Sequence, residues 1–177
     1  MADGPEAEDD PDGFSDRRSK TALDLHHYAP VHLINLGNKI ASIASAYYRP
    51  RFGIGVTDLR IMALLGNRPW ISPREIAEAT GLDKGAVSRS VHGMRRRGLI
   101  EVRSNSGEVH RQSVALTGEG LSLHDEIVPV AREREESLFE ALDDGQRREL
   151  MSLVGRLEAS LSGQAATAGR RRRPTRE

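Results

Sequence analysis

The sequence contains no cysteine among its 177 residues. This absence excludes a disulfide framework, a zinc site built on cysteine and a thiol-based redox switch. No apolar run approaches the roughly 18 residues that a helix needs to cross a bilayer. The amino terminus is acidic, whereas a secretory signal is basic and then apolar. We therefore expect a soluble cytoplasmic protein with no membrane partner.

The chain also lacks a net charge, because 26 basic residues balance 26 acidic ones. Net charge thus gives no reason to expect a nucleic-acid partner, but the distribution of charge does. Between residues 84 and 111, seven Lys and Arg residues stand against two glutamates, which leaves a local charge of +5. A concentrated basic patch attracts a polyanion even when the whole chain is neutral.

The motifs of common enzymes are missing as well. We find no phosphate-binding glycine loop, no nucleophile elbow and no metal-ligand pair at helical spacing. The segment "HHYAPVH" holds His26, His27 and His32, but His27 and His32 are five residues apart and Pro30 lies between them. Ligands on one helical face are three or four residues apart, so this set would have to be completed from elsewhere, for which His124 and Asp125 are the candidates. We expect no enzyme activity, no cofactor and no metal site.

The two ends of the chain have the composition of unfolded segments. Residues 1–24 carry eight acidic residues and few apolar ones, so they cannot bury enough surface to fold. Residues 163–177 end in "GRRRRPTRE" and form a basic counterpart, which we also expect to be disordered. This tail either touches the phosphate backbone of a nucleic acid or has no specific role.

Apolar stripes at helical spacing follow the acidic end and precede the basic end. In residues 25–55 the stripe follows Pro30, and in residues 118–162 it occupies two helices, the first kinked at Pro129 and the second capped by Asp143 or Asp144. Each stripe is too apolar to face water and needs a partner within the chain or in a second copy. We favour the second copy. The stripe residues are Leu33, Leu36, Ile40, Ile43 and Tyr47, then Leu121, Ile127, Val130, Leu138 and Leu142, and finally Leu150, Leu153, Val154, Leu157 and Leu161.

The middle of the chain, residues 56–117, begins with a helix capped by Thr57 and then reads as a helix-turn-helix. Ser72 and Glu75 form a capping box around Pro73, Gly81 suits a tight turn, and Asp83 caps the next helix. The spacing of Ala77, Gly81 and Val87 allows two short helices to cross closely. On the second helix, Val87, Val91 and Met94 are expected to face the core.

The opposite face of this second helix fits the major groove of DNA. Its small residues Gly85 and Ala86 let the backbone approach base edges, and Arg89 is long enough for a bidentate contact to guanine. The arginines at positions 95–97 either bind phosphate, for which we select Arg96, or complement the helix dipole. The expected DNA-binding residues are Ser72, Lys84, Gly85, Ala86, Ser88, Arg89, His92, Arg96, Arg103, His110 and Arg111.

A strand, a polar loop and a second strand follow this helix in "LIEVRS", "NSGEVH" and "RQSVALT". This pattern is typical of a wing, whose basic residues Arg103, His110 and Arg111 would enter the adjacent minor groove. The segment "PWIS" is a candidate for a short third strand, with Trp70 partly buried in the core.

With "SPREIAEATGLDKGAVSRSVHGMRRRGLIEV" followed by "ALTGEG", the sequence resembles the MarR family of bacterial transcription regulators. "LGNKIASIASAYYRPRFGIGVTDLRIMALL" is similar to the family's first two helices, and the resemblance spans residues 28–162. It implies a mainly α fold with a small β wing, in which a winged helix-turn-helix lobe lies between N- and C-terminal dimerisation helices. The family wing usually carries Asp-x-Arg, where this chain has Glu108 and His110, with Arg111 one step further. Arg111 is our choice for the wing contact.

The resemblance also implies a function. The expected protein is a homodimer on a pseudo-palindromic DNA site, with half-sites about one helical turn apart, and a repressor released by a small aromatic or phenolic ligand. Arg60 either binds a ligand carboxylate or forms an internal salt bridge with Asp58, Glu75 or Asp125. A winged-helix module that binds a protein partner is the alternative. The candidate ligand-binding residues are His32, Asn35, Tyr47, Tyr48 and Arg60.

Overall fold

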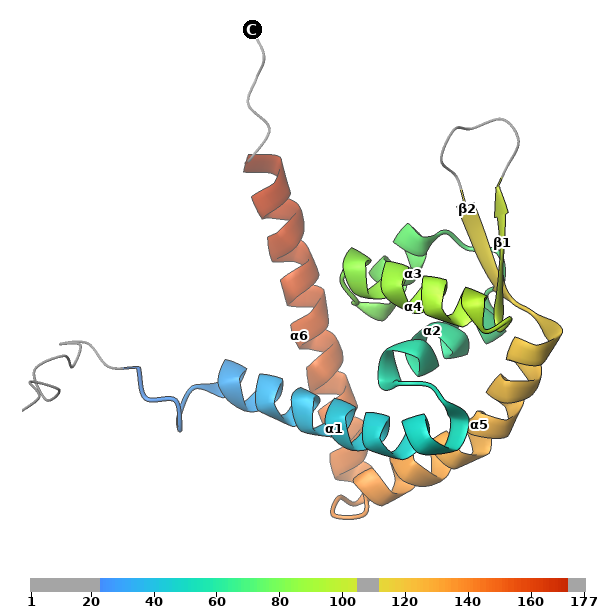
Figure 1. The fold of residues 1–177 in the computed structure, drawn as a ribbon. Helices are drawn as coiled ribbons and strands as arrows, with labels where there is room; N and C mark the ends of the chain where they lie inside the picture. Colours follow the sequence, from blue (N-terminus) through green and yellow to red (C-terminus); the bar gives the residue numbers. More distant parts are fainter. Residues whose placement is uncertain (1–22, 105–111, 172–177) are drawn as a thin grey trace, which may run out of the picture. The chain divides into compact units, whose positions relative to one another are not determined.

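The computed structural model describes residues 23–104 and 112–171. Two compact units divide the chain, residues 1–56 and residues 57–177. The fold is mainly helical with one antiparallel pair of strands, as the sequence predicts. Within the described ranges, no helix is long and apolar enough to cross a membrane. In chain order the elements are α1 (Ala29–Phe52), α2 (Val56–Asn67), α3 (Pro73–Thr80), α4 (Lys84–Arg96), β1 (Ile100–Ser104), β2 (Gln112–Leu116), α5 (Gly118–Leu138) and α6 (Asp144–Arg171), shown in Figure 1.

Helix α1 makes up most of the described part of the first unit. Pro30 lies in its first turn, where a missing N–H costs no hydrogen bond. The helix passes through Pro50 and ends at Gly53, whose φ of 69° favours glycine. The N–H of Gly53 donates to the carbonyl of Arg49 at 2.9 Å, which closes the helix. Large apolar side chains along its first two thirds are exposed, namely Leu33, Ile34, Leu36, Ile40 and Ile43.

The helix-turn-helix forms with the caps that the sequence predicts. The N–H of Glu75 donates to Ser72 Oγ at 3.2 Å, and the N–H of Ser72 donates to Glu75 Oε2 at 2.8 Å. Gly81 ends α3 with φ 65°, and Asp83 Oδ1 accepts the N–H of Ala86 at 2.9 Å at the start of α4. These local hydrogen bonds fix both ends of the turn, so α3 and α4 pack against each other.

The core of the second unit is built from the inward faces of these helices and the wing. Val87 and Met94 on α4 are each 1% exposed, which confirms the predicted inward face. They join apolar residues of α2, α3, β2 and α5, which are also almost completely buried: Ile61, Met62, Leu65, Ile76, Val114 and Ile127. This core holds α4 with its polar face outward.

The wing is an antiparallel hairpin in which Ile100 pairs with Leu116 and Ser104 pairs with Gln112. The predicted third strand is reduced to a single bridge, in which the N–H of Val114 donates to the carbonyl of Ile71 at 2.9 Å. The residue before this bridge, Trp70, has φ 62°. This left-handed turn prevents a regular strand, and Trp70 is half-buried as expected.

The C-terminal helices begin where side chains cap them. Thr117 Oγ1 accepts the N–H of Gly120 at 3.0 Å, and Asp143 Oδ1 accepts the N–H of Gln146 at 2.9 Å. Asp143 is thus the cap of α6. Gly120 lies so close to the wing that a Cβ atom there would be 2.1 Å from the carbonyl oxygen of Leu99. Only glycine allows this approach of α5 to the chain leaving α4.

Three predicted boundaries differ from the structure. Helix α2 begins at Val56, one residue before the predicted cap Thr57, and the Val56 N–H donates to Ser45 Oγ at 3.2 Å. Helix α5 ends at Leu138, which leaves Leu142 in the turn before α6. Helix α6 continues to Arg171 through the first nine residues of the expected tail. Residues 1–22 and 172–177, which hold most of the acidic end and the last residues of the tail, lie outside the described residues.

Candidate nucleic-acid interface

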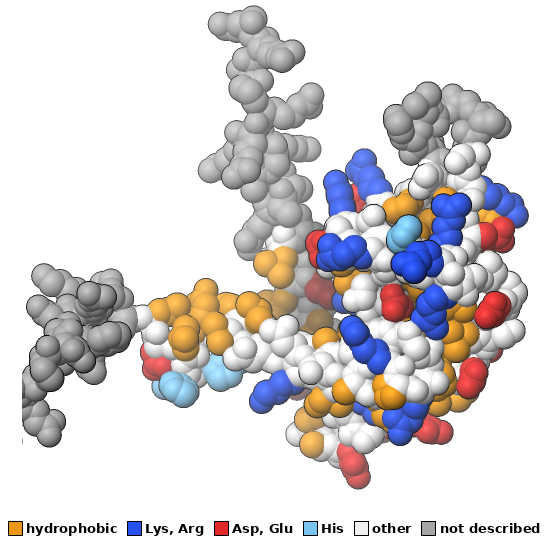
Figure 2. Space-filling view, viewed as in Figure 1, with side chains coloured by type: hydrophobic (Ala, Val, Ile, Leu, Met, Phe, Trp, Pro, Cys, Tyr) orange, Lys and Arg blue, Asp and Glu red, His pale blue; other side chains and the backbone are white. Residues whose placement is uncertain are grey.

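The outer face of α4 carries the candidate DNA contacts that the sequence identifies. Lys84, Ser88, Arg89 and His92 are exposed there, while Gly85 and Ala86 are half-buried. Lys and Arg side chains gather over α4 and the adjoining hairpin in the view of Figure 2. The face combines donors for phosphate and bases with a backbone that small residues leave accessible.

Gly85 provides room for its neighbours on this face. A Cβ atom there would be 3.1 Å from Arg89 Nη1 and 3.1 Å from Asp83 Oδ1. The Arg89 guanidinium therefore lies along the helix, one turn toward its N-terminus. Any side chain at position 85 would compete with both groups for this space.

The other candidate contacts near the helices have roles in the fold. Ser72 Oγ donates to Glu75 Oε2 at 2.7 Å, so its hydroxyl belongs to the capping box. The arginines at positions 95–97 are exposed at the end of α4, where positive charge also complements the helix dipole.

Helix α2 holds α3 and α4 through two polar contacts that the sequence patterns did not predict. Ser90, which is 9% exposed, donates its hydroxyl hydrogen bond to the carboxylate of Asp58. Arg60 donates to the carbonyl oxygen of Thr80 at the end of α3, and not to one of the predicted carboxylates. The sequence offered one signal for the first contact. Ser90 is a polar residue on the side of α4 that is otherwise apolar, and a buried hydroxyl needs a partner.

The wing supplies one described cation to this region, Arg103 at the end of β1. Its guanidinium carbon lies 3.5 Å from the centre of the Trp70 ring, and its Nη2 lies 3.8 Å from Glu101 Oε2. The side chain of Arg103 is 63% exposed, so its outer edge faces solvent. Glu108, His110 and Arg111 lie in the loop outside the described residues.

The candidate ligand-binding residues belong to both units of the chain. On α1, His32 Nε2 donates to the carbonyl of His26 at 2.7 Å, and the guanidinium of Arg51 lies 3.9 Å from the centre of the Tyr47 ring. Tyr48 is 3% exposed and forms edge contacts with Tyr47 at 5.5 Å between ring centres. Asn35 is exposed on the same helix, and Arg60 lies on α2.

The histidine-rich segment before α1 forms hydrogen bonds of its own. His27 Nδ1 donates to Asp24 Oδ2 at 2.6 Å, and the N–H of His26 donates to Asp24 Oδ1 at 2.9 Å. The hydrogen bond from His27 lowers the pKa of the Asp24 carboxyl below its ordinary value. Among the described side chains, no group of three or more His, Asp or Glu residues is placed to hold a metal ion.

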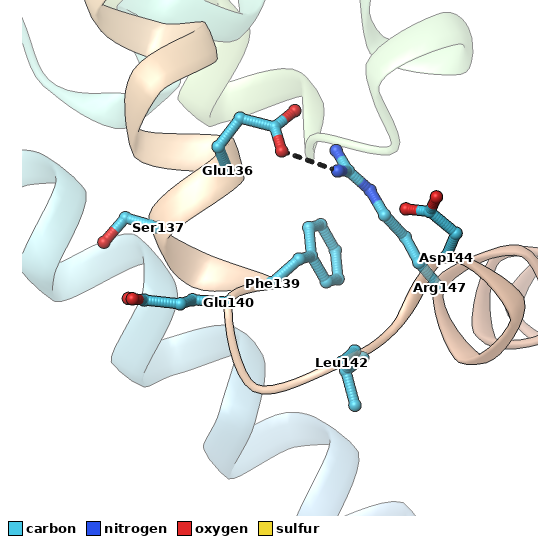
Figure 3. A pocket seen from close by; sticks show the side chains of 7 residues that line it. All are labelled: Glu136, Ser137, Phe139, Glu140, Leu142, Asp144 and Arg147. Carbon is cyan, nitrogen blue, oxygen red and sulfur yellow. Dashed lines mark hydrogen bonds and ion pairs between the residues drawn. The ribbon is translucent and has the colours of Figure 1, made fainter.

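A separate cavity of about 360 Å³ lies at the turn between α5 and α6 (Figure 3). Arg147 dominates its polar lining, with Nη1 2.9 Å from Glu136 Oε2 and Nη2 3.1 Å from Glu135 Oε1. The hydrogen bonds to Glu136 and Glu135 raise the pKa of this guanidinium. Arg147 of α6 is thereby tied to two carboxylates of α5, so we interpret this cluster as a clamp on the turn. The lining residues are Glu136, Ser137, Phe139, Glu140, Leu142, Asp144 and Arg147.

Comparisons with known proteins agree with this geometry. The sequence model of the MarR family matches residues 52–112, a range that contains the whole helix-turn-helix. A crystal structure of a MarR/EmrR family transcriptional regulator from Acinetobacter sp. ADP1 is 30% identical, with a TM-score of 0.74, over 80% of this chain and 99% of that one.

Two curated regulators are also similar in sequence. The HTH-type transcriptional regulator BilQ of Clostridium symbiosum is 26% identical over 59% of this chain and 73% of its own length. The HTH-type transcriptional repressor NicR of Pseudomonas putida is 27% identical over 49% of this chain and 54% of its own. The chain thus spans about half the length of the second relative and about three quarters of the first.

Proposed function

Because the chain belongs to the MarR family of transcription regulators, we propose that it is a homodimeric repressor that binds a pseudo-palindromic DNA site and leaves it when a small ligand binds. Its relatives are transcription regulators, so the chain is a DNA-binding regulator and not an enzyme. Repression rather than activation is supported by the likeness to the repressor NicR.

The outer face of α4 is the observation that carries this proposal. Lys84, Ser88 and Arg89 are exposed on it beside Gly85 and Ala86, while Val87 and Met94 fix the opposite face in the core. This arrangement allows the helix to enter the major groove with Arg89 over a base pair. A surface that binds a protein partner would not need small residues and a cation at this spacing.

The proposal of a homodimer is supported by the apolar side chains that α1 and α6 leave in water. Large exposed apolar stripes on a single chain indicate an interaction surface. A second copy is the partner we propose for these stripes, because a two-fold dimer buries the same surface on both protomers. On α6 the exposed residues are Leu150, Met151, Leu153, Leu157 and Leu161, which are 38–63% exposed.

The proposal of a ligand rests on the family resemblance and on the position of α2. Asp58 and Arg60 connect this helix to α4 and α3, so a ligand that shifts α2 also shifts the DNA-binding helices. The candidate residues for contact with an aromatic acid stay His32, Asn35, Tyr47 and Tyr48 on α1 and Arg60 on α2. A panel of substituted benzoates tests this: one member should raise the melting temperature of the protein and release it from DNA. If no member does either, the aromatic ligand is contradicted.

The DNA-binding part is tested with DNA from upstream of the protein's own gene. In a mobility-shift assay, the full chain should bind this duplex at two salt concentrations in the presence of unrelated competitor, with affinity that falls steeply as salt rises. The variant Arg132→Ala, an exposed arginine of α5, should bind like the wild type. Binding no tighter than to unrelated duplex across the whole upstream region would contradict the proposal and favour a protein partner.

A further inference from the structure

Trp70 adopts a backbone conformation that tryptophan normally avoids. Its φ of 62° lies in the left-handed region, and among the described non-glycine residues it alone has a positive φ. Glycine would adopt this turn without steric cost. A tryptophan here therefore costs stability, and the contacts of its side chain indicate what offsets that cost.

The indole ring forms a platform for one side chain of the wing. The guanidinium carbon of Arg103 lies 3.5 Å from the ring centre, at the distance of close stacking. Ile71 is bridged to Val114 on β2, and β2 pairs on its other side with β1, where Arg103 faces Ser113. The side chain of Arg103 thus crosses β2 to reach Trp70, and this contact fixes its direction.

Stacking leaves the hydrogen-bonding edge of the guanidinium available. The N–H groups of arginine lie in the guanidinium plane, so a ring against its face does not occupy them. Arg103 is 63% exposed, and Glu101 lies 3.8 Å from one nitrogen without closing the solvent side. A guanidinium that is already ordered and exposed can bind a phosphate oxygen well, because the side chain loses little further conformational entropy on binding.

The position of Arg103 along the chain indicates which part of DNA it meets. The N–H of Leu99 donates to the carbonyl of Met94, so β1 starts directly at the end of α4. When α4 occupies the major groove, the hairpin that continues from its end, with Arg103 near the end of β1, lies beside the backbone that borders this groove. We propose that Trp70 is a positioning residue, which holds the side chain of Arg103 near the end of β1 so that its N–H groups bind a DNA phosphate.

This inference rests on the proposed DNA-binding function and is tested by a double-mutant cycle in the full-length protein. The variants are Trp70→Gly, which suits φ 62° and removes the platform, Arg103→Ala, and both together. Arg103→Ala should weaken binding to the upstream duplex and to unrelated duplex by the same factor, and reduce the salt slope of log K by about 1. Trp70→Gly should cause part of both changes. Trp70→Phe, which keeps an aromatic ring, should bring the affinity and the salt slope back toward the wild-type values.

The double variant distinguishes positioning from a general effect on the fold. With Arg103 already removed, Trp70→Gly should cause no further loss of affinity. An equal loss from Trp70→Gly in both backgrounds, or an unchanged salt slope in Arg103→Ala, would overturn the inference. If Arg89→Ala abolishes site-specific binding in the same assay while Arg103→Ala changes nothing, only this inference fails. If the wild type itself shows no specific binding, the proposed function fails.

Discussion

The hydroxyl of Ser90 on α4 donates a hydrogen bond to the carboxylate of Asp58 in the first turn of α2. Ser90 is almost completely buried and stands next to Arg89, the exposed residue proposed to read a base. Buried polar groups require partners, so this bond fixes the rotation of α4 about its axis. The core-facing serine thereby sets the direction in which Arg89 leaves the helix.

Replacing Ser90 by alanine should therefore destabilise the fold. The variant removes a donor from the half-buried carboxylate of Asp58, and we expect the free energy of unfolding to fall by about 1–3 kcal/mol. Urea denaturation followed by circular dichroism measures this change. Ser88→Ala on the exposed face of the same helix is the control and should stay within about 0.5 kcal/mol of the wild type. Equal stability of the two variants would show that the bond contributes nothing.

Gly120 should not tolerate even a methyl group. A Cβ atom there would lie 2.1 Å from the carbonyl oxygen of Leu99, so either α5 or the start of the wing has to move. We expect Gly120→Ala to lower the free energy of unfolding by about 1–3 kcal/mol or more, as overpacking does.

The matched control lies two residues earlier in the same helix. A Cβ atom added at Gly118 would meet no other part of the described chain within 4 Å, and at this first position of α5 alanine is at least as good a helix former as glycine. Gly118→Ala should thus leave stability unchanged or raise it. If Gly120→Ala melts at the same temperature as Gly118→Ala, position 120 does not lie close to the carbonyl oxygen of Leu99 in solution.

The exposed stripe of α6 should be required for dimer formation. Leu157→Glu places a charge on a surface that we expect to be buried against a second copy, so the variant should sediment as a monomer and lose specific DNA binding. Ala159→Glu adds the same charge two residues further on, which is the opposite side of a helix with 3.6 residues per turn, and should remain dimeric. Analytical ultracentrifugation at equal concentrations compares them, and a dimeric Leu157→Glu protein would contradict this interface.

The predictable parts of the fold depend on neighbours in sequence. The caps at Ser72 and Asp83 and the turn at Gly81 were predictable because each bond joins residues three positions apart or requires one backbone conformation. The spacing of Val87, Val91 and Met94 at steps of four and three residues likewise predicted which face of α4 is buried.

The contacts that sequence patterns did not predict join residues far apart in the chain. Ser90 lies 32 residues from Asp58, and Arg60 lies 20 residues from Thr80, so periodicity carries no information about these pairs. The stack of Arg103 on Trp70 depends in addition on an unusual backbone angle, which no local propensity favours. These tertiary contacts nevertheless orient the residues proposed to touch DNA.

The most direct test of the account is the sequence dependence of binding by Arg89→Ala. Fluorescence anisotropy with the upstream duplex and with an unrelated duplex of equal length separates base contacts from phosphate contacts. We predict a loss of about 1–3 kcal/mol on the upstream duplex and a much smaller loss on the unrelated one, with Arg132→Ala unchanged on both. Equal losses on the two duplexes, or none, would contradict the assignment of α4 as the helix that reads DNA.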